Sequence, residues 1–174
     1  MRIAKKKMPR LFIAIDLNDE MKDSLMGIQD AMRDHGMRGR ETVPENMHLT
    51  LAFIGDFGDA GLVKEVVESV ELRPFRIKLS GIGAYGDLWW AGLEDSPPLL
   101  AVSRRLRRAL AEAGVPFDRK RFSPHITLMR RATGTAADIP AGELDRYFDA
   151  SMTVDHISLM RSDRGRHGMI YTEL

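Results

Sequence analysis

Two spacings of apolar residues run along this chain, and each predicts a different kind of element. Apolar residues at three- and four-residue steps predict amphipathic helices with one buried stripe. Short apolar or alternating runs predict strands. The predicted helices run from the Asn18 cap to Gly36, from Leu62 to Val70 and from Leu99 to Ala113. The predicted strands cover residues 11–15, 47–54, 75–79, 88–93, 121–129, 148–159 and 169–174.

The segments between these elements carry turn signals. Glycines at positions 81, 83 and 86 predict a loop or a bulged strand, and residues 132–140 are small, polar and loop-like. A charged turn over 161–168 is expected to join the last two strands. Helices and strands in this order predict an α+β fold.

One four-residue pattern occurs twice within the predicted strands. His48-Leu49-Thr50-Leu51 and His125-Ile126-Thr127-Leu128 both read His-x-Thr-Leu, and almost half of the chain separates them. A predicted helix comes before each of them. The repeat therefore predicts two similar lobes, although the halves share little else residue by residue.

Strand geometry places the polar residues of each motif together. Side chains alternate between the two faces of a strand, so His48 and Thr50 share one face. Leu49, Leu51 and Phe53 are expected on the opposite face. His125 and Thr127 share a face in the same way. If the two polar faces meet, two imidazoles and two stiff β-branched hydroxyls line a single cleft.

Two histidines can cleave a phosphodiester when they hold different protonation states. A neutral imidazole takes a proton from water, and an imidazolium gives one to the leaving oxygen. This chemistry needs no metal, and the chain has neither cysteine nor a His-Glu-x-x-His motif. The residues themselves do not say which histidine is the acid. For a single motif, a strand histidine satisfied by a hydrogen bond is the simpler interpretation, and the pairing argues against it.

Composition sets the remaining limits. A chain of 174 residues that is 44% hydrophobic can bury a core, and 26 basic against 25 acidic residues give no overall case for nucleic-acid binding. With no cysteine there are no disulfides, which suits a reducing compartment. No run reaches the roughly 18 apolar residues of a membrane span. We expect a soluble cytoplasmic protein with a frayed basic N-terminus.

The stretches around the two motifs resemble a known family. Residues 44–55 and 122–130 are similar to the two signatures of the 2H phosphoesterase superfamily, and more closely to its RNA 2′,3′-cyclic phosphodiesterase branch, the 2′-5′ RNA ligase family. Residues 10–14, 88–93 and 168–174 also fit that branch. The resemblance implies a single domain over residues 1–174, made of two pseudo-symmetric lobes. Each lobe would hold an antiparallel sheet with helices on its outer face, and a groove would lie between them.

The resemblance also implies a reaction and the residues that perform it. RNA 2′,3′-cyclic phosphate ends would be hydrolysed to 2′-phosphomonoesters without a cofactor or metal, and reversible 2′-5′ RNA ligation would be a second reaction. By motif position, His48 would be the proton donor and His125 the proton acceptor. Thr50 and Thr127 would hold phosphate oxygens. The alternatives are a non-catalytic RNA or nucleotide-binding module, and an enzyme for another cyclic or 2′-5′ linked nucleotide.

Several residues outside the motifs are further candidates. Arg130 could neutralise the phosphate, although strict alternation turns it away from the groove unless the strand bulges or ends at Met129. Aromatic candidates for base stacking are Phe12, Tyr85, Trp89 and Trp90, of which only one tryptophan can face the groove. Arginines 104, 105, 107 and 108 form either a basic flank for RNA or a solvated helix face. His35, His156 and His167 read as surface or loop residues. A monomer is expected, since the groove lies within one chain.

Overall fold

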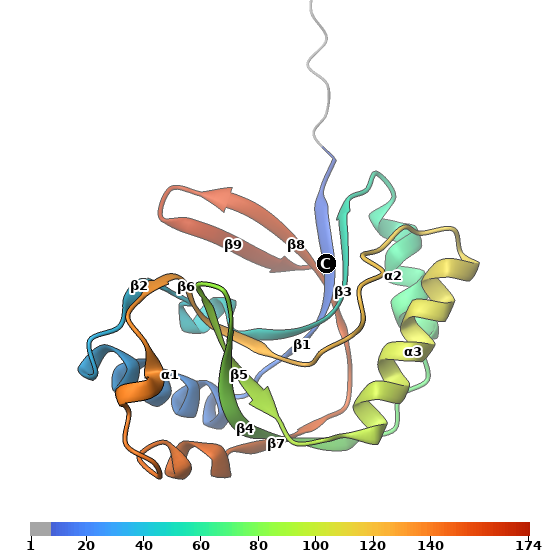
Figure 1. The fold of residues 1–174 in the computed structure, drawn as a ribbon. Coiled ribbons are helices and arrows are strands. Elements are labelled where there is room, and N and C mark those ends of the chain that lie inside the picture. The colour runs from blue at the N-terminus through green and yellow to red at the C-terminus, as the bar shows by residue number, and fades with distance from the viewer. Residues whose placement is uncertain (1–7) are drawn as a thin grey trace, which may run out of the picture.

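The computed structural model describes residues 8–174, and the basic segment 1–7 lies outside them. Two antiparallel sheets form the two lobes (Figure 1). The first sheet has the order β3–β1–β8–β9, with β1 Arg10–Asp16, β3 His48–Asp56, β8 Ser158–Gly165 and β9 Gly168–Glu173. The second has the order β2–β6–β5–β4–β7, with β2 Arg38–Glu41, β4 Phe75–Tyr85, β5 Leu88–Leu93, β6 Ile126–Thr133 and β7 Ser151–Val154.

Three α-helices within residues 8–174 cover the sheets, as the apolar spacing predicts. They are α1 Asp19–Asp34, α2 Ala60–Ser69 and α3 Pro97–Glu112. Asn18 caps α1 by accepting a hydrogen bond of 2.9 Å from the Met21 amide, and Gly36 follows the helix with a φ of 88°. Helix α1 packs on β2, β6 and β7, α2 packs on β8, and α3 contacts both sheets through β3 and β4. The α+β fold with helices outside two sheets is confirmed.

The buried side chains of both lobes form one apolar cluster. Leu11, Ile13 and Leu49 of the first sheet and Ile126 and Leu128 of the second are all without solvent exposure. These are the apolar partners of the two His-x-Thr motifs. Because these side chains are packed in the core, they fix the position of the strands, and the polar residues on the opposite face of each motif are fixed with them. Among residues 8–174, no helix has the length and apolar character that crossing a bilayer requires.

Three strand predictions need correction. Residues 148–159 form two strands, because the chain leaves β7 in one sheet and enters β8 in the other. The hairpin between β8 and β9 is longer than expected, and its turn is confined to Arg166 and His167. The strand of the second motif starts at Ile126 and not at residue 121, so His125 immediately precedes it. Strand β2 was not expected, since Arg38–Glu41 contains no apolar residue.

Two bulges change which side chains reach the space between the sheets. In β3, Ala14 of β1 pairs with Thr50 and Ile13 with Ala52, so Leu51 is an extra residue. Phe53 therefore lies on the same side as His48, is 36% exposed, and does not share the buried face predicted for it.

The second bulge lies in β6. Trp90 of β5 pairs with Thr127 and Trp89 with Met129, which leaves Leu128 as the extra residue. Leu128 and Met129 are both buried. The next residue, Arg130, consequently lies on the same side as Thr127, so a bulge one residue before Met129 has the effect predicted for a bulge at Met129.

Candidate active site

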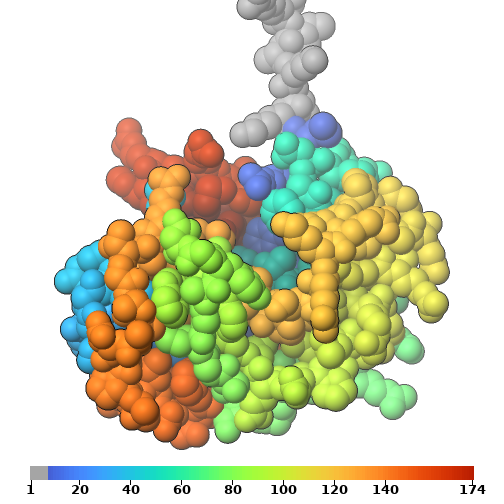
Figure 2. Space-filling model, viewed as in Figure 1, coloured from blue at the N-terminus to red at the C-terminus, as the bar shows by residue number. Residues whose placement is uncertain are grey.

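A groove of about 730 Å³ lies between the two lobes. Figure 2 shows a hollow near the centre of one face, with the blue of β1 visible at depth between red, green and orange segments. A volume of this order suits a small ligand such as a nucleotide. All six residues proposed from the sequence line the groove, namely Phe12, His48, Thr50, His125, Thr127 and Arg130.

His48 is held in one tautomer by its neighbours. Its Nδ1 lies 2.7 Å from the backbone oxygen of Asn46, which can only accept, so Nδ1 carries the hydrogen. Its Nε2 lies 3.0 Å from Oγ1 of Thr50 on the same strand. The Asn46 side chain donates to the backbone oxygen of Met169 at 2.9 Å and thereby ties this turn to β9. The Nε2 atom of His48 is therefore the atom that faces the groove.

The aromatic rings of Phe12 and Tyr171 pack against the His48 imidazole. The ring of Phe12 lies 4.8 Å from the imidazole, and the ring of Tyr171 meets it edge-on at 5.1 Å. Burial lowers the pKa of His48, and the positive charge of Arg130 acts in the same direction, while the hydrogen bond to Asn46 opposes both. In the free protein at neutral pH, His48 is therefore neutral.

His125 shows the same tautomer in a different setting. Its Nδ1 lies 2.8 Å from the backbone oxygen of Ser123, so its Nε2 is again the unprotonated nitrogen of the neutral ring. The ring of Tyr85 meets the imidazole edge-on at 5.5 Å, and the Tyr85 hydroxyl lies 3.1 Å from Oγ of Ser123. Trp90 lies 6.3 Å from the imidazole. In both histidines, Nδ1 is bonded to a backbone oxygen and Nε2 is left to act on a ligand. Only His48 packs between two aromatic rings of the first sheet, those of Phe12 and Tyr171.

The aromatic residues considered for base stacking mainly pack against the histidines or the core. Phe12 is only 4% exposed and its ring packs against His48 and Tyr171, so it positions the imidazole and offers little stacking surface. Trp90 lies beside His125, whereas Trp89 packs on the core, and neither tryptophan is among the residues that line the groove. A Cβ atom at Gly83 would come within 2.3 Å of the Trp90 ring, which explains why glycine stands at that point of β4.

Three further arginines and one histidine line the groove besides Arg130 and the two motif histidines. Arg40 and Arg166 carry no local signal in the sequence, and His167 has the sequence context of a loop residue, yet all three line the groove. The β8–β9 hairpin brings Arg166 and His167 there. Arg10 also reaches the groove, with its guanidinium 5.1 Å from the centre of the Phe53 ring.

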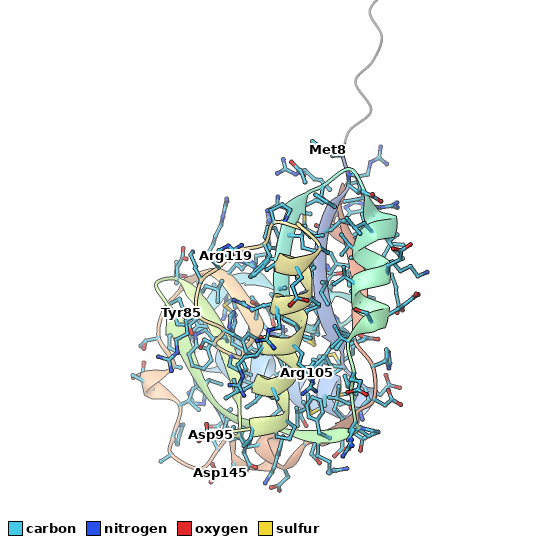
Figure 3. The ribbon with its side chains drawn as sticks, turned by 90° about the vertical axis from the view of Figure 1, so that its right-hand side faces the viewer. Met8, Tyr85, Asp95, Arg105, Arg119 and Asp145 are labelled. Atoms are coloured by element: carbon cyan, nitrogen blue, oxygen red, sulfur yellow. The ribbon has the colours of Figure 1, made fainter. Side chains whose placement is uncertain are left out.

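The arginines of α3 do not belong to this groove. Arg104, Arg105 and Arg108 are exposed on the outer face of the helix, and Figure 3 shows Arg105 there. Arg107 is half-buried, donates to the backbone oxygen of Lys120 at 2.8 Å and lies near two phenylalanine rings. Burial lowers its pKa. Of the two interpretations of this helix, the solvated face fits three of the arginines and a packing role fits the fourth.

The other two histidines outside the motifs are surface residues with acidic partners. His35 lies 2.9 Å from Glu143, and His156 lies 2.6 Å from Asp155, which lowers the pKa of that carboxyl. Across residues 8–174, no three histidine, aspartate or glutamate side chains gather closely enough to hold a metal ion.

The fold and the groove define a class of two-lobed α+β proteins with one His-x-Thr pair from each lobe. The sequence model of the 2′-5′ RNA ligase superfamily matches residues 24–166, and the chain belongs to that superfamily.

Several of its relatives match almost its whole length. The chain is 30% identical to the RNA 2′,3′-cyclic phosphodiesterase of Methanothermobacter thermautotrophicus, over 95% of this chain and 96% of that protein. It is also 30% identical to the protein of the same name from Escherichia coli, over 95% and 93%. The apo crystal structure of E. coli LigT superposes with a TM-score of 0.79 at 26% identity, covering 97% of this chain and 96% of the other. LigT complexed with 3′-AMP gives a TM-score of 0.77 at 28% identity over the same shares.

Proposed function

We propose that this groove hydrolyses the 2′,3′-cyclic phosphate at RNA 3′ ends to a 2′-phosphomonoester by acid–base catalysis with two histidines. The observation that carries the proposal is that both imidazoles, each fixed through Nδ1 to a backbone oxygen, line the same groove together with both threonines. The names of the relatives and the 3′-AMP bound to LigT support this substrate class.

The proposed step assigns one proton transfer to each imidazole. Nε2 of His125 takes a proton from water while the water oxygen attacks phosphorus. The bond between phosphorus and O3′ breaks, and O3′ takes the proton that Nε2 of His48 carries. The phosphate stays on O2′. Thr50 and Thr127 donate hydrogen bonds to the non-bridging oxygens, and the Arg130 guanidinium balances their charge.

The different surroundings of the two histidines supply the asymmetry that this step requires. His48 is neutral in the free protein, because burial lowers its pKa. An anionic phosphate bound beside it raises that pKa and draws a proton onto Nε2. The Thr50 hydroxyl, which lies 3.0 Å from that nitrogen, is then free to turn to a phosphate oxygen. Substrate binding would therefore protonate His48, the general acid. In 2′-5′ ligation a 5′ hydroxyl would take the place of water and lose its proton to His125, and His48 would again protonate O3′; the two histidines would exchange roles when the 2′-5′ linkage is cleaved back to the cyclic phosphate.

The test is turnover of adenosine 2′,3′-cyclic phosphate by His48→Ala and His125→Ala variants, with EDTA present. We expect each to lose at least about 100-fold in kcat, the usual contribution of a general acid or base. His156→Ala is the matched control, since that histidine is exposed and paired with Asp155. Chromatography should identify adenosine 2′-phosphate as the product. Activity near that of the wild type in either groove variant would exclude the mechanism.

The same assay separates the alternatives. A non-catalytic module would bind adenosine 2′-phosphate saturably and turn over none of the cyclic phosphate. An enzyme for other substrates would prefer a 2′-5′ linked dinucleotide or another cyclic nucleotide in a substrate panel. We also propose that the protein acts as a monomer, because both motifs that form the groove come from one chain. We propose the cytoplasm as its compartment, which the lack of cysteine suits.

A further inference from the structure

Two arginines stand directly opposite each other on neighbouring strands. The register of β2 and β6 pairs Arg40 with Arg130, and both side chains line the groove. Directly opposed residues of an antiparallel pair point to the same face, with Cβ atoms about 5 Å apart. Like charges in this arrangement repel, so the pair carries a cost that a bound anion would remove.

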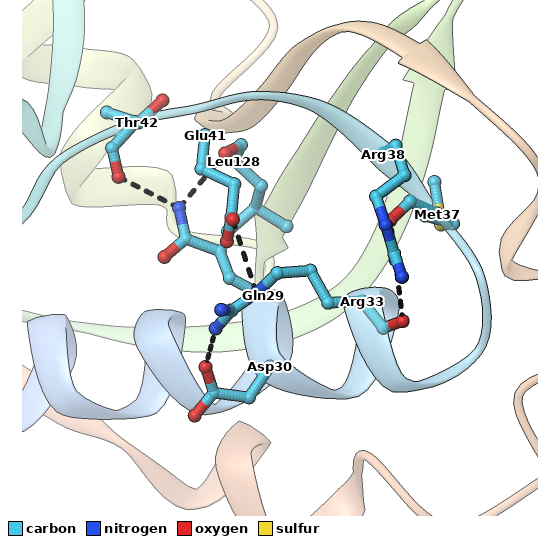
Figure 4. Close-up of polar contacts among 8 residues, drawn as sticks. All are labelled: Gln29, Asp30, Arg33, Met37, Arg38, Glu41, Thr42 and Leu128. Atoms are coloured by element: carbon cyan, nitrogen blue, oxygen red, sulfur yellow. Dashed lines mark hydrogen bonds and ion pairs between the residues drawn. The ribbon is translucent and has the colours of Figure 1, made fainter.

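Nearby acidic groups do not neutralise this pair. Glu41, the neighbour of Arg40, is also among the residues that line the groove, but its carboxylate forms an ion pair of 3.2 Å with Nε of Arg33 on α1 (Figure 4). In the described part of the chain, neither Arg40 nor Arg130 has a side-chain hydrogen bond or an ion pair within 4.0 Å. Their two positive charges are therefore available to a ligand.

The strands that carry the pair are held rigidly. Gln29 of α1 is 4% exposed, and its Nε2 donates to the backbone oxygens of Thr42 at 2.9 Å and Leu128 at 3.0 Å (Figure 4). The Thr42 amide also donates to the Leu128 oxygen at 3.0 Å. These bonds fix β2 and the bulge of β6 to each other, so the backbone that carries the two arginines is preorganised.

The two arginines lie at different distances from the reacting centre. The charge of Arg130 acts on His48, whereas Arg40 is not among the groups that shift the pKa of that histidine. Strand β2 is the edge of its sheet, so Arg40 stands one strand beyond Arg130, a step of about 4.8 Å. A phosphate between the histidines would contact Arg130, and Arg40 would meet a second anionic group farther along the ligand.

We propose that Arg40, together with Arg130, forms a subsite for a second phosphate, the one attached to O5′ of the terminal nucleoside. The proposal rests on the proposed function, in which the first phosphate is the 2′,3′-cyclic one. It makes the preferred substrate a 5′-phosphorylated nucleotide or an RNA chain, in which every terminal nucleoside carries that phosphate. A nucleoside 2′,3′-cyclic phosphate with a free 5′ hydroxyl leaves the subsite empty.

The first test compares kcat/KM for adenosine 2′,3′-cyclic phosphate with and without a 5′-phosphate. We expect the wild type to prefer the 5′-phosphorylated substrate, and Arg40→Gln to reduce that preference about tenfold or more, since a charge-assisted hydrogen bond is lost. Arg40→Lys should keep part of it. Arg104→Gln removes the same charge from the exposed face of α3 and should leave the preference as in the wild type. An unchanged preference in Arg40→Gln, or an equal loss in Arg104→Gln, would overturn the proposal.

A binding measurement makes the result independent of turnover. Calorimetry would compare adenosine 3′,5′-bisphosphate with adenosine 3′-monophosphate, and the bisphosphate should bind more tightly to the wild type but not to Arg40→Gln. If the wild type hydrolyses neither substrate yet shows this difference, the proposed function fails and the subsite stands. If it hydrolyses both substrates at equal efficiency and binds both ligands equally, the subsite fails and the proposed function stands.

Discussion

Replacement of Gln29 tests whether its hydrogen bonds to β2 and β6 hold Arg130 in position to act in the groove. Its amide nitrogen donates both of its hydrogens, one to Thr42 and one to Leu128, the extra residue of the β6 bulge. Gln29→Met keeps the length of the side chain and removes both donors. The Leu128 oxygen retains the Thr42 amide as a partner, and the half-buried Thr42 oxygen can turn to water.

The magnitude follows from these contacts. Two hydrogen bonds of about 1 kcal/mol each are lost, and the apolar replacement recovers the packing, so the free energy of unfolding should fall by about 2 kcal/mol. Gln29→Glu should be worse at neutral pH, because a carboxylate would face two carbonyl oxygens and donate to neither. Its penalty should shrink as the pH falls, since a protonated carboxyl can donate one hydrogen bond. Gln29→Met should show no comparable pH dependence.

Urea unfolding at pH 5 and pH 8 measures these free energies for the wild type and both variants. Activity provides a second readout, because the bulge is what turns Arg130 toward the groove. The loss of kcat/KM caused by Arg130→Met should be smaller in a Gln29→Met background than in the wild type. A loss of stability below about 0.5 kcal/mol for Gln29→Met, together with additive effects on kcat/KM, would refute this reasoning.

Three further predictions concern the groove and the helix beside it. The basic limb of kcat should lie at higher pH than that of kcat/KM, because bound phosphate raises the pKa of His48 that burial lowers in the free enzyme; coincident limbs would contradict this. Tyr171→Leu should raise the pKa of His48 in an NMR titration by admitting water beside its ring. Arg107→Met should cost about 1–2 kcal/mol in urea unfolding, and Arg104→Met less than about 0.5 kcal/mol.

The sequence predicts the residues of the groove better than it predicts their orientation. Spacing and capping place the helices, and strand alternation puts each histidine beside its threonine, because these follow from local geometry. A bulge breaks the alternation without a clear sign in the sequence. For that reason the position of Phe53 was predicted wrongly, and that of Arg130 depended on a bulge that only the structure locates.

Long-range pairing accounts for the groove residues that the sequence did not reveal. Strand β2 has no apolar residue and owes its existence to pairing with β6, so nothing local marks Arg40 as a groove residue. Arg166 and His167 reach the groove through the β8–β9 hairpin, whose position depends on the pairing of β8 with β1. The lowered pKa of His48 likewise depends on rings from β1 and β9, which lie far from it in the sequence.

The central claim is that His48 and His125 act together in one reaction. The most direct test is the kcat of His48→Ala, His125→Ala and the double variant on the same RNA-end cyclic phosphate. If both imidazoles serve one step, each single variant loses nearly all of the acid–base contribution, and the double variant loses little more than either one. Losses that multiply in the double variant, or a single variant with nearly full activity, would contradict the account.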